Sequence, residues 1–205
     1  MKIAIIGAGG IGGYVGTQLA LAGEEVTFMV RGAHLAAIRQ QGMKLVMHDG
    51  SEHVARNVQA SDQYAATGPQ DIVILALKAH QVEAVAADVP HLLGPDTVVV
   101  TMQNGIPFWY FHRHGGPHEG TAVRSVDSNG DLPLRIPVER VIGCVVYPAS
   151  ELIAPGVVRH IEGDRFPVGE LDGRHSANIQ KISEYMRRER IKEHVLRLIR
   201  SKKWI

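Results

Sequence analysis

Three glycines near the start of the chain have the spacing of a dinucleotide-binding loop. Gly7, Gly9 and Gly12 follow the pattern G-x-G-x-x-G. In this pattern the first glycine permits a tight turn, the second lets a pyrophosphate approach the backbone, and the third permits close helix packing. A helix beginning near Gly10 would point its free N–H groups and positive dipole end at the phosphates. The candidate cofactor-binding residues are therefore Gly7, Ala8, Gly9, Gly10, Ile11 and Gly12.

Arg31 predicts which dinucleotide this loop binds. Folds that bind NAD usually carry an Asp or Glu about 20 residues after the glycines, where it bonds the ribose 2′-hydroxyl. Arg31 occupies that place here, and a guanidinium can bind a 2′-phosphate through two parallel charge-assisted hydrogen bonds. The sequence therefore favours NADP (NADPH) as the cofactor over NAD. The alternative is a solvated arginine at the end of a strand.

Lys78 and Asn104 each follow an apolar run, and we assign both as candidate catalytic and cofactor-binding residues. Ligands of open parallel sheets bind outside the carboxyl ends of the strands, so these side chains should lie beside the glycine loop. Lys78 offers a point charge to a phosphate or carboxylate, and Asn104 can donate to or accept from a ribose hydroxyl or keto oxygen. For either residue alone, a solvated loop position is the competing interpretation.

The elements that must position these residues can be read from short apolar runs. Residues 2–6, 26–30, 72–77 and 98–100 are continuously apolar or nearly so and are bounded by Gly, Pro or charged residues, as buried parallel strands are. Amphipathic segments at 10–22 and 82–89 predict helices that connect them. The alternation predicts an α/β fold of the Rossmann type, a doubly wound parallel sheet.

Two local features complete the first half of the chain. Residues 34–41 predict a short helix that ends at Gly42. Residues 44–47 and 53–58 flank Asp49-Gly50, and Asp-Gly between two β-type runs is a strong hairpin signal.

Composition limits the classes of function. The chain has 205 residues, of which 45% are hydrophobic and 21% charged, with a net charge of +1, as in a soluble globular protein. This balance favours neither nucleic acid nor a membrane surface as a partner. The single cysteine, Cys144, lies in an apolar run and is expected in the core, which fits a reducing compartment. Since no apolar run approaches the ~18 residues of a membrane span, we expect a cytoplasmic protein.

Several stretches together resemble the ketopantoate reductases, NADPH-dependent enzymes of pantothenate biosynthesis also called 2-dehydropantoate 2-reductases. The resemblance rests on GAGGIG at 7–12, Arg31, ALKAHQ at 76–81, MQNGIP at 102–107 and the run from 140 to 170. It implies that the glycine loop and Arg31 hold NADPH while Lys78 and Asn104 lie near the nicotinamide ribose and the substrate. It also implies a backbone contact from Ala149 to the cofactor. The implied activity is reduction of a 2-oxoacid of the ketopantoate type.

The same resemblance implies two units, an NADP-binding domain at 1–172 and the opening segment of a helical domain at 173–205. Family members carry a general-acid lysine in an early helix of the second domain, within an Arg-x-x-x-Trp-x-Lys pattern. Here Arg200 and Trp204 match that pattern, and the sequence ends at Ile205, before the lysine. We therefore expect a truncated family member. The alternative function is a catalytically idle NADP-binding module that lacks its substrate domain.

Four remaining features carry expectations of their own. The run Phe108-Trp109-Tyr110-Phe111 predicts core or interface packing, with a pocket wall as the alternative. His112, His114 and His118 lie in a Gly/Pro-rich loop, and we expect no metal site there. Residues 181–203 hold nine Lys/Arg against three Glu, and we expect solvated faces of helices with Ile191, Val195 and Ile199 inward. Apolar surface bared by a missing domain predicts a homodimer through that exposed domain-interface surface.

Overall fold

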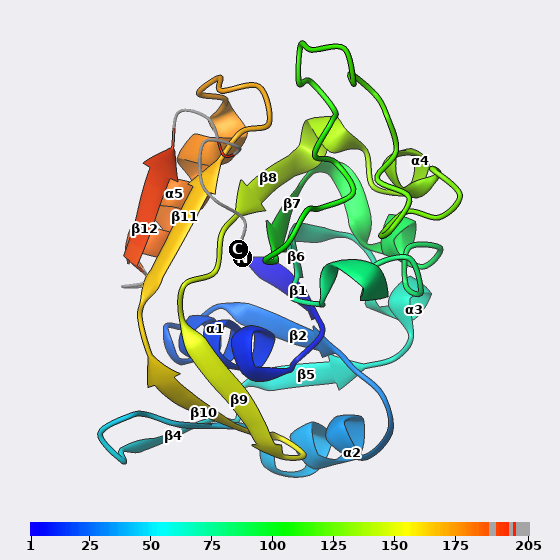
Figure 1. The fold of residues 1–205 in the computed structure, drawn as a ribbon. Helices are drawn as coiled ribbons and strands as arrows, with labels where there is room; N and C mark the ends of the chain where they lie inside the picture. The colour runs from blue at the N-terminus through cyan, green and yellow to red at the C-terminus, as the bar shows by residue number, and fades with distance from the viewer. Residues whose placement is uncertain (189–191, 197–198, 200–205) are drawn as a thin grey trace.

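The apolar runs of the sequence form one eight-stranded sheet in the computed structural model, which describes residues 1–188, 192–196 and 199 (Figure 1). Its order is β12-β11-β8-β7-β6-β1-β2-β5, and every neighbouring pair is parallel except β11 with β8. The run β5-β2-β1-β6-β7-β8 is the order of a Rossmann sheet, so the predicted α/β fold is confirmed. The strands are β1 (Lys2–Ile6), β2 (Glu25–Met29), β5 (Val58–Ser61), β6 (Gln70–Leu75), β7 (Leu93–Met102), β8 (Val141–Cys144), β11 (Arg165–Gly169) and β12 (Lys192–Leu196).

Alternation along the strands divides the core between the two faces of this sheet. In β1, Ile3 and Ile5 belong to one buried cluster, whereas Ala4 and Ile6 belong to the other. The first face is covered by α1 (Gly10–Leu21), α5 (Ala177–Arg188) and a smaller sheet. The second is covered by the connections that follow β6 and β7, including η1 (Ala79–Gln81), η2 (Val89–Leu92), α4 (Leu132–Arg135) and η3 (Val138–Arg140). The strands are apolar at nearly every position because both faces of the sheet are buried.

The predicted crossover helix at 82–89 is wrong. The structure places two 3₁₀ turns, η1 and η2, and intervening turns between β6 and β7, with hydrogen bonds such as Val85 N–H to the Val82 carbonyl at 3.1 Å. Pro90 explains part of this, because a proline disfavours the α conformation of the residue before it and has no N–H to donate. Val82, Ala86 and Val89 are still buried against the sheet, so the helical spacing of apolar residues marked a packed turn region.

A second, four-stranded sheet has the order β4-β3-β10-β9. The predicted hairpin is confirmed as β3 (Met43–Val46) paired antiparallel with β4 (Glu52–Ala55), and Gly50 in its turn has φ +83°. The sequence did not predict the partner on the other side. There β10 (Val157–Glu162) runs parallel to β3 and forms a hairpin with β9 (Ala149–Ala154). This sheet packs on α1 and brings residues near 150 to the glycine loop (Figure 1).

Two short helices complete the first half, α2 (Gly32–Gln41) and α3 (Tyr64–Thr67). The prediction of a helix ending at Gly42 is confirmed, since Gly42 has φ +80° and follows the last residue of α2. Arg31 is the residue directly before α2, and His34 lies in its first turn. Both side chains therefore leave the chain close to the carboxyl end of β2.

The C-terminal segment differs from the all-helical expectation. Helix α5 is confirmed, with Ile179 and Ile182 buried, but 192–196 form strand β12, which pairs in parallel with β11. The spacing of Ile191, Val195 and Ile199 suits a helix, yet pairing with an open sheet edge satisfies the backbone N–H and C=O groups equally well. Ile199 is buried as expected. Ile191, the motif residues Arg200 and Trp204, and Ile205 lie outside the described residues.

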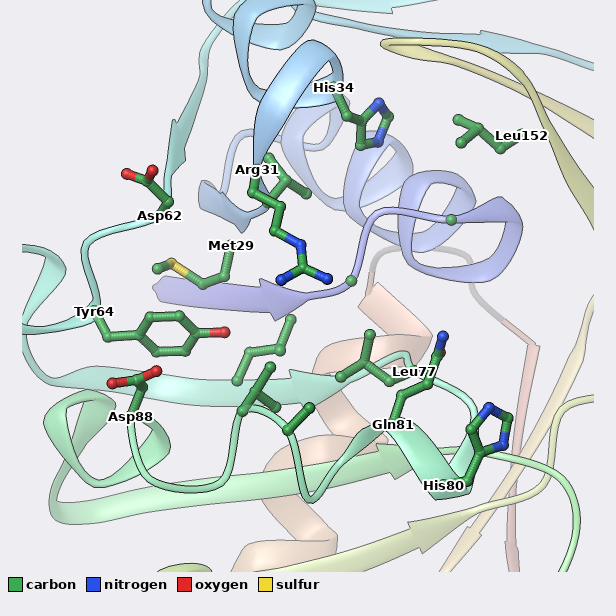
Figure 2. A pocket seen from close by; sticks show the side chains of 16 residues that line it. Met29, Arg31, His34, Asp62, Tyr64, Leu77, His80, Gln81, Asp88 and Leu152 are labelled. Atoms are coloured by element: carbon green, nitrogen blue, oxygen red, sulfur yellow. The ribbon is translucent and has the colours of Figure 1, made fainter.

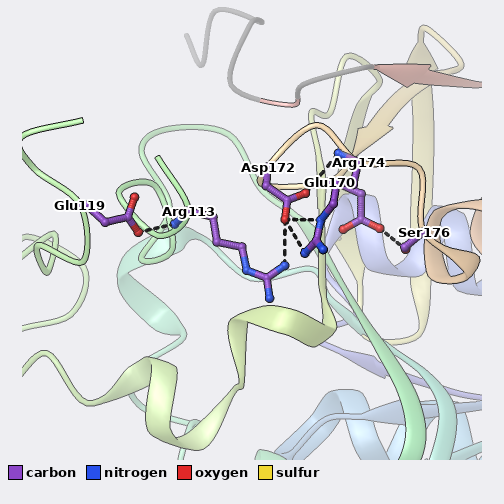
Figure 3. A network of polar contacts seen from close by, with 6 residues as sticks. All are labelled: Arg113, Glu119, Glu170, Asp172, Arg174 and Ser176. Atoms are coloured by element: carbon purple, nitrogen blue, oxygen red, sulfur yellow. Dashed lines mark hydrogen bonds and ion pairs between the residues drawn. The ribbon is translucent and has the colours of Figure 1, made fainter. Parts of the chain in front are cut away.

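A polar network ties the loop after β7 to the segment between β11 and α5 (Figure 3). Asp172 accepts hydrogen bonds from Arg113 Nη1 at 2.9 Å and from Arg174 Nε at 2.8 Å. Ser176 donates to Glu170. Despite some desolvation, the two arginines hold the pKa of Asp172 down to about 2, whereas burial raises the pKa of Glu170.

The aromatic run and Cys144 belong mainly to the core. Phe108 and Trp109 are buried, and Trp109 Nε1–H donates to Thr101 Oγ1 at 3.1 Å. Neither they nor Tyr110 and Phe111 line the two cavities described below, so the pocket-wall alternative is wrong for those cavities. Burial raises the pKa of the Cys144 thiol, which keeps it protonated.

Within residues 1–188, 192–196 and 199, no group of three or more His, Cys, Asp or Glu is arranged to hold a metal ion. No helix in the same ranges has the length and apolar character needed to cross a bilayer.

Candidate functional site

The glycine loop joins β1 to α1, and each glycine in it has a different steric surrounding. Gly7 has φ +90°, and a Cβ there would overlap Leu77. A Cβ on Gly12 would overlap the Gly7 carbonyl oxygen and Ala76, and one on Gly10 would overlap the Ser150 carbonyl of β9. Gly9 has φ −68° and open space around its missing Cβ. The loop therefore has no room for a side chain at Gly7, Gly10 or Gly12, whereas the space beside Gly9 is open.

Two cavities meet at this loop, and we name each by one residue. The Arg31 cavity, about 750 Å³, includes Arg31, His34, Tyr64 and Asp88 in its lining (Figure 2). The Asn104 cavity, about 500 Å³, includes Lys78, Gln103, Asn104, Ala149 and Ser150. Both volumes lie in the range of small-molecule sites, ~300–1,000 Å³. Gly7, Gly9, Leu77 and Gln81 line both cavities, so the two form adjoining halves of one site.

The Arg31 cavity carries both signs of charge. Figure 2 shows the Arg31 guanidinium over the carboxyl end of β1, with Asp62, Tyr64 and Asp88 grouped to one side. Burial, reinforced by Asp88 and opposed by Arg31, raises the pKa of Tyr64 to about 12. The Tyr64 hydroxyl is therefore a neutral donor at physiological pH. The cavity combines an exposed cation with a neutral phenol and two carboxylates.

His34 is a lining residue that sequence reasoning treated only as part of a helix. Its Nε2 lies 2.7 Å from the Ala8 carbonyl oxygen, and the Gly156 N–H donates to its Nδ1 at 2.8 Å. The ring thus connects α2 to the glycine loop and to the turn between β9 and β10. Its position three residues after Arg31 could have marked it as a lining residue. Its partners could not be predicted, because they lie 26 and 122 residues away in the sequence.

The Asn104 cavity brings together the other candidate residues. Lys78 and Asn104 are both exposed and both line it, as does Ala149 at the start of β9. The Asn104 amide is already engaged: Nδ2 donates to the Val146 carbonyl at 2.9 Å, and the Val146 N–H donates to Oδ1 at 3.0 Å. Each amide end keeps one further hydrogen-bonding capacity, a second N–H and a second lone pair.

Gln81 is the second lining residue that the sequence did not single out. Its Oε1 accepts the Lys78 backbone N–H at 3.0 Å, which leaves the two Nε2–H donors at the junction of the cavities. The side chain closes the short turn η1 and so depends on the residues immediately after β6.

The structure separates the six loop residues into two groups. Gly7, Gly9, Gly10 and Ile11 line one or both cavities. Ala8 is 2% exposed and Gly12 is buried, and neither lines either cavity. Ala8 contributes its carbonyl to His34, while Gly12 lets α1 approach the strand end. The structure thus gives these two predicted contact residues a hydrogen-bonding and a packing role within the fold of the loop.

Comparison with known proteins matches the chain to one family. The family model described as ketopantoate reductase PanE/ApbA covers residues 3–173. The chain belongs to the ketopantoate reductase PanE/ApbA family. A 2-dehydropantoate 2-reductase of Mesorhizobium japonicum is 47% identical over 206 residues, which span 100% of this chain and 63% of that protein. The chain therefore spans less than two thirds of the length of this relative.

Solved structures agree with this ketopantoate reductase assignment. A candidate ketopantoate reductase from Ralstonia solanacearum superposes with a TM-score of 0.91 and 40% identity, over 97% of this chain and 61% of that one. A D-mandelate dehydrogenase solved with NADH and anilino(oxo)acetate shares the fold, with a TM-score of 0.75 and 24% identity over 96% of this chain and 57% of that one. The resemblance read from the sequence is thus confirmed.

Proposed function

We propose that the two adjoining cavities bind NADPH and that the whole protein reduces a 2-oxoacid of the ketopantoate type to the corresponding hydroxy acid. The observation that carries this proposal is the position of Gly7 and Gly9, which line both cavities between Arg31 and Asn104. An extended dinucleotide needs this arrangement, with a backbone loop at its diphosphate and one half in each cavity. Membership of the ketopantoate reductase family supports the same function.

The Arg31 cavity suits the adenosine half of the cofactor. Arg31 would bind the 2′-phosphate of NADPH through its forked N–H donors, while Tyr64 and Asp88 offer a donor and an acceptor to the ribose or the adenine. The fold alone does not impose NADPH, since the D-mandelate dehydrogenase with the same fold was solved with NADH. Preference for NADPH therefore rests on Arg31.

The Asn104 cavity suits the nicotinamide half and the reacting carbonyl. When bound there, the cofactor supplies a hydride to the keto carbon. Negative charge then develops on the substrate oxygen, and the Lys78 ammonium is placed to counter it. The remaining Nδ2–H of Asn104 can orient that oxygen or a ribose hydroxyl, and the backbone of Ala149 can contact the nicotinamide side.

We also propose the domain division at residue 172, with a cofactor unit at 1–172 and a second unit beginning at 173–205. The family match ends at residue 173, which supports a boundary near that point. The pairing of β12 with β11 means that part of the second segment packs with the cofactor unit. Limited proteolysis, followed by mass spectrometry, tests the boundary: cleavage should concentrate near 172–176.

We further propose a homodimer through the apolar surface beside the Asn104 cavity. Ile106, Tyr147 and Ile161 are 51%, 55% and 48% exposed, and Ile161 lines the cavity itself. Exposed apolar side chains of this size favour association. Sedimentation at tens of micromolar should give a dimer, and replacing Ile106 by Ser should shift it toward the monomer; a single monomeric species of the unchanged protein would contradict this.

The decisive experiment measures NADPH binding and turnover on one sample. Titration calorimetry should give saturable binding with 1:1 stoichiometry, and absorbance at 340 nm should then be followed after adding ketopantoate. Binding with turnover supports the reductase, whereas binding without turnover in the 205-residue chain favours the alternative of an idle NADP-binding module. Absence of NADPH binding would overturn the proposal.

A further inference from the structure

His34 makes two hydrogen bonds that join three separate parts of the fold. One runs to the Ala8 carbonyl in the glycine loop at 2.7 Å, and the other comes from the Gly156 N–H at 2.8 Å. The partners lie 26 residues before and 122 residues after His34. Figure 2 shows the ring at the edge of the Arg31 cavity, between α2 and Leu152 of β9.

The two partners determine where the hydrogen of the ring lies. A backbone N–H can only donate, so His34 Nδ1 must accept from Gly156 through its lone pair. The neutral ring then carries its hydrogen on Nε2, where it donates to the Ala8 carbonyl. One side chain therefore acts as acceptor at one end and donor at the other.

The bond to Ala8 fixes the direction of the neighbouring Gly9 N–H. The Ala8 carbonyl and the Gly9 N–H belong to one planar trans peptide, in which the two groups point in opposite directions. Holding the carbonyl toward His34 therefore turns the Gly9 N–H the other way. Gly9 lines both cavities at their junction, where the diphosphate of a dinucleotide would lie.

Gly156, at the far end of the link, has further contacts of its own. Gly156 has φ +74°, and its carbonyl accepts the Lys44 N–H of β3 at 2.8 Å. A Cβ on Gly156 would stand 3.2 Å from Ala37 Cβ of α2, so the turn lies close to the helix that carries His34. Strand β3 of the smaller sheet therefore holds the Gly156 turn, and the His34 ring links that turn to the glycine loop.

We propose that His34 is a positioning residue for the cofactor diphosphate, acting through the Ala8–Gly9 peptide. This inference rests on the proposed binding of NADPH. It goes beyond that function because it assigns the orientation of the loop to a side chain outside the loop and to the β9–β10 turn. A positioning role of this kind affects ligands that carry the diphosphate and spares ligands that lack it.

The test compares two ligands on three variants. NADPH spans both cavities, whereas adenosine 2′-monophosphate has the adenine, the ribose and the 2′-phosphate without the diphosphate. His34→Ala removes both hydrogen bonds, while His34→Gln keeps a donor and an acceptor on one side chain. His53→Ala is the matched control, because His53 lies exposed on β4 and lines neither cavity. Calorimetry gives the affinities, and thermal unfolding checks that each variant is folded.

We expect His34→Ala to weaken NADPH binding by about five- to tenfold, the effect of about one net hydrogen bond. Its affinity for adenosine 2′-monophosphate should stay within about twofold of the unchanged chain. His34→Gln should recover most of the NADPH affinity, and His53→Ala should change neither. The backbone ¹⁵N–¹H signal of Gly9 should shift in free His34→Ala and return toward its original position in His34→Gln.

Two results would overturn the inference. Equal losses for both ligands would mean that His34 contacts the adenosine directly or supports the cavity generally. Unchanged NADPH affinity in a folded His34→Ala variant would show that the loop orients itself without the ring. Failure of the unchanged chain to bind NADPH at all would instead overturn the proposed function, together with the inference that depends on it.

Discussion

Asn104 and Val146, which both line the Asn104 cavity, exchange two hydrogen bonds. The amide Nδ2–H donates to the Val146 carbonyl, and the Val146 N–H donates to Oδ1, at 2.9 and 3.0 Å. The ladder between β7 and β8 ends at Met102 and Cys144. Beyond it, the Asn104 side chain supplies the hydrogen bonds that a paired strand would otherwise give to the Val146 backbone. The same amide that is proposed to orient the substrate oxygen thus also holds the adjacent loop in place.

Asn104→Ala should therefore affect both stability and binding. Loss of the two hydrogen bonds is expected to lower the free energy of unfolding by about 1–2 kcal/mol, measured by urea denaturation. NADPH affinity should fall as well, because the segment leading to Ala149 loses its anchor. Asn57→Ala is the control, since Asn57 donates to the Ala20 carbonyl at 2.8 Å away from both cavities. It should lower stability alone; an equal loss of NADPH affinity there would contradict the assignment.

Arg31→Ala should remove most of the preference for NADPH over NADH. Charge-assisted hydrogen bonds are worth about 1.5–3 kcal/mol, which corresponds to roughly 10–150-fold in affinity. NADH binding should change little, because NADH has no 2′-phosphate. Arg39→Ala, in the helix α2 that follows Arg31, removes a donor to the Ala60 carbonyl at 2.9 Å and should leave the preference intact. Equal affinity of the unchanged chain for both cofactors, measured by calorimetry, would defeat the assignment of NADP.

Gly9→Ala and Gly12→Ala should separate binding from folding. Gly9 has an ordinary φ and free space, so its methyl group should change the free energy of unfolding by less than about 0.5 kcal/mol. The same methyl projects where the diphosphate approaches, and NADPH affinity should fall at least about tenfold. Gly12→Ala places a Cβ against the Gly7 carbonyl and should cost more than about 2 kcal/mol of stability. A stable Gly12→Ala variant would argue against this packing.

Asp172 should make the protein less stable in acid. Its folded pKa of about 2 lies below the ordinary 3.8, so the stabilisation is complete above pH 4 and is lost as the pH falls from about 4 to 2. The gain is expected to be at most about 1 kcal/mol, because Arg174 is largely exposed and water screens the pair. Asp172→Asn should remove this part of the pH dependence in denaturation curves at pH 2–6. An unchanged acid limb in the variant would refute the prediction.

Glu170 should act in the opposite direction. Burial raises its pKa above the ordinary 4.5, so the folded state disfavours the ionised form and loses stability as the pH rises through that value. Glu170→Gln keeps an acceptor for the Ser176 hydroxyl and removes the charge. The variant should match the unchanged chain near pH 4 and become more stable than it, by less than about 1 kcal/mol, at pH 7. Lower stability of the variant at pH 7 would be the contrary outcome.

Much of the central sheet followed from local sequence. Apolar runs bounded by Gly, Pro or charged residues marked β1, β2, β6 and β7 because strands buried on both faces need apolar side chains throughout. The need for glycine at position 7 could be predicted from the chain alone, because its positive φ favours glycine. The assignment of Arg31 to a 2′-phosphate stays a prediction. The spacing of apolar residues does not decide between helix and strand where it fits both periods. Residues 192–196 form β12 because the edge of β11 is open to pairing.

The sequence by itself determined the glycine loop between β1 and α1, the strands β1, β2, β6 and β7 of the Rossmann sheet, and the family. Only the tertiary structure decided which groups meet. The parallel pairing of β3 with β10, the contact of Gly10 with Ser150, and the links from His34 to Gly156 and from Asn104 to Val146 join residues far apart in the chain. No local periodicity records such contacts, because each depends on backbone groups that every residue type carries and that only the folded chain brings within hydrogen-bonding distance.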